Sequence, residues 1–118
     1  MEIKIIDTKI SKKEVETLAQ QGFGDMVKGV VDAEQGIMAV GGELHADEEA
    51  VLLENGSKQE HLWGINIYPF LPYAEQIEFD SMINIRPLQS NRSRNVESEE
   101  IKNKIIYIVK KLIDDTNS

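Results

Sequence analysis

The sequence contains no cysteine, which excludes disulfide bonds, thiolate metal sites and cysteine nucleophiles. No apolar run approaches the roughly 20 residues that a membrane-spanning helix needs, so we expect no membrane association. Met1–Lys4 lack the basic and apolar regions of a signal peptide. Together these absences favour a cytoplasmic protein.

Arginine is scarce, and the three arginines lie within nine residues of one another as Arg86, Arg92 and Arg94. The window Ser81–Val96 has no acidic residue and carries +3, against −8 for the whole chain. A strongly acidic protein repels phosphate backbones, so no nucleic-acid partner is expected. The guanidinium fork suits carboxylates and phosphates. The window therefore predicts an anion site, unless these arginines pair with the protein's own carboxylates.

The 118 residues are 41% hydrophobic and 29% charged, as in one globular domain spanning residues 1–118. Apolar runs predict strands at Glu2–Ile6, Met26–Val31, Ile37–Val40, Trp63–Tyr68 and Ile77–Arg86, and helical spacing predicts helices at Lys12–Gln21 and from Ser98 to about Ile113. Ser11 and Ser98 stand where helix caps are expected, and Gly36 suits a hairpin turn. The order of elements predicts an α+β fold: a two-layer sandwich in which a mainly antiparallel sheet of four to five strands carries two helices on one face.

The segment Glu43–Asp47 fits two structures. As a strand it would place Glu43, His45 and Asp47 on one face, a ligand set suited to manganese, iron, zinc or magnesium. Asp80 or Glu78 could add a fourth ligand, and such a divalent metal ion could activate water for hydrolysis. Alternatively, Asp47 caps a short helix through Glu54 and no metal binds.

Polar side chains alternate along the predicted strand Ile77–Arg86, and Asn66 and Tyr68 share a face of the predicted strand Trp63–Tyr68. If these two strands pair, amide, phenol, carboxylate and guanidinium groups converge on one surface. Trp63 is expected to be a core residue. The candidate ligand-binding residues are Asn66, Tyr68, Asp80, Asn84, Arg86, Asn91, Arg92 and Arg94.

Three long motifs and a short one resemble a prokaryotic family of small proteins of unknown function. They are Gly41–Asp47 (GGELHAD), Leu62–Pro69 (LWGINIYP), Ile77–Pro87 (IEFDSMINIRP) and Asn91–Arg94 (NRSR). The resemblance covers nearly the whole chain and implies that these polar segments belong together. It implies no activity, ligand or partner.

Two function classes follow from these observations. The first is a binding protein whose polar sheet face and arginine loop hold an anionic small molecule or an acidic segment. The alternative is a metal-dependent hydrolase of phosphoesterase type that uses Glu43, His45, Asp47 and Asp80. A third, structural hypothesis is a homodimer in which the polar sheet faces cover each other.

Overall fold

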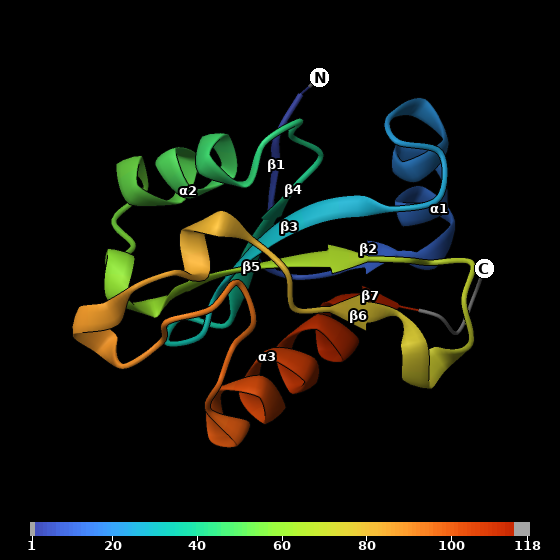
Figure 1. Cartoon of the computed structure of the whole chain (residues 1–118). Helices are drawn as coiled ribbons and strands as arrows, with labels where there is room; N and C mark the ends of the chain where they lie inside the picture. Colours follow the sequence, from blue (N-terminus) through green and yellow to red (C-terminus); the bar gives the residue numbers. More distant parts are fainter. Residues whose placement is uncertain (1, 115–118) are drawn as a thin grey trace.

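The computed structural model describes residues 2–114 and contains a five-stranded sheet in which every neighbouring pair is antiparallel (Figure 1). The strand order is β1-β4-β3-β5-β6. The sheet strands are β1 (Lys4–Ile6), β3 (Val27–Asp32), β4 (Ile37–Val40), β5 (Leu62–Ile67) and β6 (Ile77–Glu78), and the helices are α1 (Lys12–Gln21), α2 (His45–Glu54) and α3 (Glu99–Leu112). This architecture confirms the predicted α+β class. No helix within residues 2–114 is long and apolar enough to cross a membrane.

The local signals predicted two helices and one hairpin correctly. The Ser11 hydroxyl accepts the backbone N–H of Glu14 at 3.1 Å, and the Ser98 hydroxyl accepts that of Ile101 at 3.2 Å. Each bond satisfies one of the backbone donors that a helix leaves free at its N-terminus. Gly36 turns the β3–β4 hairpin with a φ of +72°. A short parallel pair, β2 (Ile10–Ser11) with β7 (Ile113–Asp114), joins the start of α1 to the end of α3.

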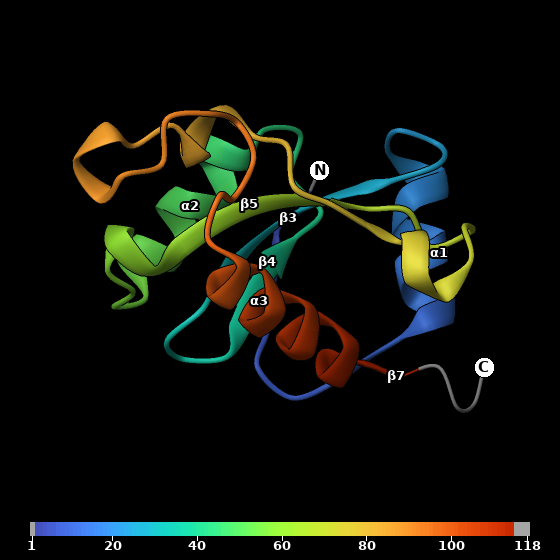
Figure 2. The same ribbon diagram turned by 60° about the horizontal axis from the view of Figure 1, so that its bottom comes forward.

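One face of the sheet carries the main hydrophobic core beneath α1 and α3 (Figure 2). Side chains on a strand alternate between faces, so every second residue of β3, β4 and β5 points to this side. Val31, Met38 and Ile65 from the sheet are almost fully buried there against Val15 of α1 and Ile105 of α3. The two predicted helices therefore share a face, as expected. Trp63 is also buried in this core, at 2% exposure.

The opposite face is covered by α2, over only part of its area. Leu52 of α2 packs with Val30, Ala39 and Leu62 of the sheet in a second, smaller apolar cluster. The helix resolves the segment that the sequence left open, because it starts at His45 and its N-cap position is Leu44 rather than Asp47. This third helix leaves the β5–β6 end of the sheet uncovered, and polar side chains occupy that end.

The predicted strand Ile77–Arg86 is wrong after its second residue. Beyond Glu78 the chain leaves the sheet and forms a 3₁₀ turn, η3 (Met82–Asn84). The Asn84 amide takes the place of strand backbone beside β5: its Oδ1 accepts the Gly64 N–H at 2.8 Å, and its Nδ2 donates to the Gly64 carbonyl at 3.0 Å.

Glycine at position 64 permits this arrangement. A Cβ there would lie 2.6 Å from both Cβ and Oγ of Ser81, which is far inside van der Waals contact. Because the chain turns away, the alternating polar face predicted from Glu78 to Arg86 does not form. Asn84 is fully buried as a structural residue.

Candidate functional site

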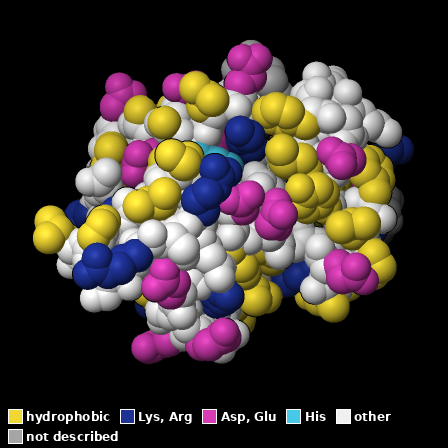
Figure 3. Space-filling view, viewed as in Figure 1, with side chains coloured by type: hydrophobic (Ala, Val, Ile, Leu, Met, Phe, Trp, Pro, Cys, Tyr) yellow, Lys and Arg dark blue, Asp and Glu magenta, His cyan; other side chains and the backbone are white. Residues whose placement is uncertain are grey.

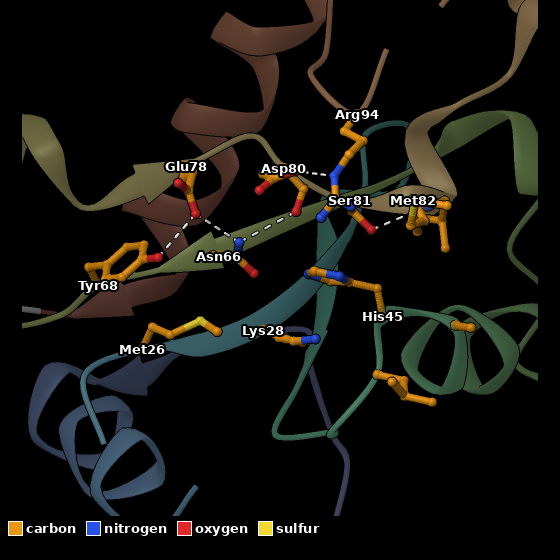
Figure 4. A pocket seen from close by; sticks show the side chains of 13 residues that line it. Met26, Lys28, His45, Asn66, Tyr68, Glu78, Asp80, Ser81, Met82 and Arg94 are labelled. Carbon is orange, nitrogen blue, oxygen red and sulfur yellow. Dashed lines mark hydrogen bonds and ion pairs between the residues drawn. The ribbon is translucent and has the colours of Figure 1, made fainter. Parts of the chain in front are cut away.

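A cavity of about 500 Å³ lies on the sheet face that α2 leaves open. Its walls are Met26, Lys28, Leu44, His45, Ala46, Asn66, Tyr68, Glu78, Asp80, Ser81, Met82, Ile83 and Arg94 (Figure 4). Figure 3 shows basic, acidic and histidine side chains meeting near the middle of this face, with hydrophobic side chains on either side. The size lies within the range of small-molecule pockets, about 300–1,000 Å³.

Strand register sets the floor of the cavity. Lys28 on β3 lies opposite Asn66 on β5, and Asn66 lies opposite Glu78 on β6. Residues directly opposite each other in a sheet point to the same face, so ammonium, amide and carboxylate form one row across three strands. The N-terminus of α2 and the segment from Asp80 to Ile83 rise on either side of the row.

The amide of Asn66 is held in one orientation. Its Nδ2 donates to Oε1 of Glu78 at 2.9 Å and to the backbone carbonyl of Asp80 at 3.4 Å. Both partners accept hydrogen bonds, so the nitrogen must face them. Oδ1 then points the other way, toward the side on which His45 and Lys28 lie (Figure 4). It is buried and has no hydrogen-bond partner within residues 2–114.

Two carboxylates, Glu78 on β6 and Asp80 just after it, form one wall of the cavity. Oε1 of Glu78 accepts the Tyr68 hydroxyl at 3.1 Å as well as the Asn66 amide. Burial and the neighbouring Glu78 carboxylate raise the pKa of Tyr68, so its phenol stays protonated and donates. Asp80 forms an ion pair with Arg94, whose Nε lies 2.5 Å from its Oδ1.

His45 closes the cavity at the start of α2. Its side chain is 9% exposed, and its Nε2 lies 2.8 Å from the carbonyl oxygen of Ile65. Burial lowers the pKa of His45, and the nearby Lys28 ammonium acts in the same direction. The ring is therefore neutral at pH 7. Because the Ile65 carbonyl can only accept, Nε2 carries the proton and Nδ1 remains an acceptor.

Lys28 contributes an ammonium group that forms no ion pair with the described part of the chain. Its one close ring contact within residues 2–114 is Phe23, at 5.2 Å from the ring centroid. In Figure 4 the Lys28 nitrogen points toward His45.

Glu48 is on the buried face of α2, three residues after His45, and does not line the cavity. Its side chain is fully buried, and Oε2 accepts the Gly42 N–H at 2.8 Å while Oε1 has no partner among the described residues. Burial raises the pKa of Glu48 to about 9, against the opposing effect of the Gly42 bond and the Lys28 charge. The carboxyl is therefore neutral at pH 7.

Four of the predicted ligand-binding residues come together in this cavity: Asn66, Tyr68, Asp80 and Arg94. The other four do not line it. The Arg86 guanidinium stacks on Trp63, 4.2 Å from the ring centroid, and donates to the backbone carbonyls of Gln59 and Leu62.

Two more of those four residues, Asn91 and Arg92, belong to the loop before α3. Asn91 is 3% exposed, and its amide donates to the Asn84 carbonyl at 2.7 Å and the Asn95 carbonyl at 2.7 Å. Arg92 is exposed, and its backbone N–H donates to Glu97 at 3.0 Å. Asn84, Arg86 and Asn91 therefore use their side chains to hold backbone groups of the protein in place. The arginine window does not form one anion site.

The extended segment that the metal hypothesis requires is absent. Glu43 precedes α2, whereas His45 and Asp47 lie within its first turn, so the three side chains do not share a strand face. Glu43 and Asp47 are exposed, and only His45 reaches the cavity. Residues 2–114 contain no group of three or more His, Asp or Glu side chains that could hold a metal ion.

Sequence reasoning missed Lys28, which completes the row of polar groups. A signal was present: it is the one charged residue inside the apolar run Met26–Val31. A lysine inside such a strand marks one face of that strand as polar. Met26 and Met82, on opposite sides of the cavity, carried no comparable signal.

These features define a small α+β protein with a polar cavity on the half-covered face of an antiparallel sheet. Residues 4–112 match the family described as a protein of unknown function, DUF5674. The chain belongs to this family, which confirms the resemblance seen in its motifs. No curated protein and no solved structure matches the chain.

Proposed function

We propose that this protein is a cytoplasmic binding protein that holds a small anionic molecule in the cavity between α2 and β6. The observation that carries the proposal is the Lys28 ammonium. It lines the cavity without forming an ion pair in the described chain, although the protein has 21 acidic residues. A carboxylate or phosphate in the cavity would supply the missing counter-ion through charge-assisted hydrogen bonds.

The N-terminus of α2 supports this proposal. Leu44, His45 and Ala46 line the cavity, and no side chain caps the helix there. The first backbone N–H groups of a helix lack partners within the helix and carry partial positive charge, which favours an anion beside them. The cavity has room for a small molecule rather than a folded segment of a partner.

The test is ligand-dependent stabilisation, measured as the melting temperature and by calorimetric titration. The probes are acetate, succinate, sulfate and inorganic phosphate, at constant ionic strength. A bound anion at 100 times its Kd stabilises the fold by about 2.7 kcal/mol, so a true ligand raises the melting temperature visibly. Lys28→Gln should weaken that binding tenfold or more, because a hydrogen bond to a charged group contributes about 1.5–3 kcal/mol.

Lys58→Gln is the matched control. Lys58 is exposed, lies outside the cavity and makes no ion pair in the described chain, so its variant should bind as the wild type does. The proposal fails if none of the four anions stabilises the wild type. It also fails if the Lys28 and Lys58 variants bind equally well.

The homodimer remains a prediction from the sequence. Sedimentation equilibrium at micromolar concentration tests it, and the mass of a single chain would remove it. The alternative, a metal-dependent hydrolase, uses Glu43, His45, Asp47 and Asp80, of which only His45 and Asp80 line the cavity, so the binding protein is the proposal that the geometry favours.

A further inference from the structure

The cavity presents opposite charges on its two sides. Lys28 on β3 and Glu78 on β6 are separated by the intervening strand β5, with Asn66 between them in the same row. Neighbouring strands lie about 4.8 Å apart, so the backbones of Lys28 and Glu78 are separated by roughly 10 Å. The two charges therefore form no ion pair with each other, and Asn66 fills the space between them.

Glu78 is exposed and forms no ion pair in the described chain, just as Lys28 forms none there. Both hydrogen bonds that Glu78 accepts come from neutral groups, the amide of Asn66 and the hydroxyl of Tyr68, and both end on Oε1. By contrast, Asp80 on the same wall is neutralised by Arg94.

Asn66 adds an unsatisfied acceptor at the centre of the row. The side chain is 7% exposed, and its Oδ1 is buried with no partner in the described chain. Because Glu78 and Asp80 fix the amide nitrogen, the side chain cannot rotate to offer a donor instead. A buried acceptor without a partner is costly, so this oxygen favours a donor in the cavity, from a water molecule or from a ligand.

We propose that the ligand is an amino acid or a close analogue, a small zwitterion with an amino group and a carboxylate a few bonds apart. This inference rests on the proposed anion site and adds the other half of the ligand. The carboxylate of the ligand lies at Lys28 and the start of α2. The ligand's ammonium group pairs with the Glu78 carboxylate on the other side of the row.

The rim of the cavity indicates where the rest of such a ligand would lie. Leu44 and Met82 are 56% and 64% exposed and stand at the mouth, and Met26 lies on the other side. Large apolar side chains exposed beside a polar floor favour a ligand whose side chain is apolar. An amino acid with an aliphatic or thioether side chain combines the two features.

The experiment compares matched ligands by calorimetric titration of the full chain. Each L-amino acid is paired with the acid that lacks its amino group and with the amine that lacks its carboxylate. Leucine, for example, is compared with 4-methylpentanoate and with 3-methylbutylamine. We expect at least one amino acid to bind at least tenfold more tightly than its acid and its amine.

One variant removes the anionic side of the site, and a second variant serves as its control. Glu78→Gln removes the charge but keeps an oxygen that can accept the Asn66 and Tyr68 donors, so the fold is retained. It should abolish the preference for the amino acid over its matched acid and leave binding of the acid within twofold. Glu75→Gln is the control, because Glu75 is exposed and lies in the loop before β6, outside the cavity.

The outcomes distinguish this inference from the proposed function. If the acids bind as tightly as the amino acids, or Glu78→Gln leaves the preference unchanged, the zwitterion is wrong and the anion site stands. If neither the acids nor the amino acids bind, both proposals fall. If the amines alone bind, Glu78 is a cation site and both proposals are wrong.

Discussion

Replacing Glu48 by glutamine should make the protein more stable at neutral pH. Glu48 is fully buried on α2, and burial raises its pKa from 4.5 to about 9. At pH 7 the carboxyl is ionised in the unfolded chain and protonated in the folded protein, so folding takes up a proton. Glutamine resembles the protonated carboxyl in shape and needs no proton.

The size of the effect follows from the shift. Each pH unit between the two pKa values changes the free energy of unfolding by about 1.4 kcal/mol. The folded state binds more protons there, so the contribution of Glu48 to wild-type stability is greatest below pH 4.5 and falls as the pH rises to about 9. At pH 7 the cost is about 3 kcal/mol, and it is absent in Glu48→Gln.

Urea unfolding of both proteins at pH 5, 6, 7 and 8 measures this difference. The variant should gain about 2.5 kcal/mol on the wild type between pH 5 and pH 7, whatever their difference at pH 5. Glu54→Gln, an exposed change on the same helix, should run parallel to the wild type. Parallel curves for Glu48→Gln and the wild type would refute the reasoning.

Three other substitutions test parts of the fold by thermal or urea unfolding. Asp32→Ala should cost about 3 kcal/mol, because the carboxylate accepts four hydrogen bonds at the β3–β4 turn. Burial acts to raise the pKa of Asp32, but these bonds outweigh it and lower the pKa, so the loss should shrink as the pH falls below about 4. Gly64→Ala should cost about 2 kcal/mol, since its Cβ would displace Ser81, and a normal melting temperature would contradict this close packing. Arg86→Lys should cost about 2 kcal/mol, because lysine cannot reproduce the guanidinium fork and its stacking on Trp63, and an Arg86→Lys variant as stable as the wild type would show that neither contact matters.

Parts of the fold could be predicted because their signals are local. Ser11 and Ser98 mark the first turns of α1 and α3, and each caps a helix with a regular apolar stripe. The hairpin was marked by Gly36 between two apolar runs. Such signals involve neighbours in sequence and need no knowledge of the rest of the chain.

Other parts depend on distant partners. The buried face of α2 carries His45 and Glu48, two polar residues whose partners are the Ile65 carbonyl and the Gly42 N–H, so no apolar stripe marks this helix. The segment after Glu78 alternates like a strand, but the Asn84 amide bonds Gly64 instead of extending the sheet. Neither bond can be inferred from residues nearby in sequence.

The candidate site could be predicted only in part, because it also depends on residues that are distant in sequence. Asn66, Tyr68 and Asp80 were found because pairing of their two segments was expected, and that pairing holds over two residues of β6. Arg86 was misplaced because its position assumed a longer strand. Lys28 was missed because the β3–β5 register that sets it opposite Asn66 is a property of the whole sheet.

The side chains that follow β6 also protect the protein from aggregation. The apolar strand β5 would expose backbone groups along its outer edge wherever β6 does not pair with it. Instead, Arg86 donates to the Leu62 carbonyl, and the Asn84 amide bonds both backbone groups of Gly64. An edge occupied in this way cannot recruit a strand from another molecule, so growth into a continuous intermolecular sheet is blocked at this strand.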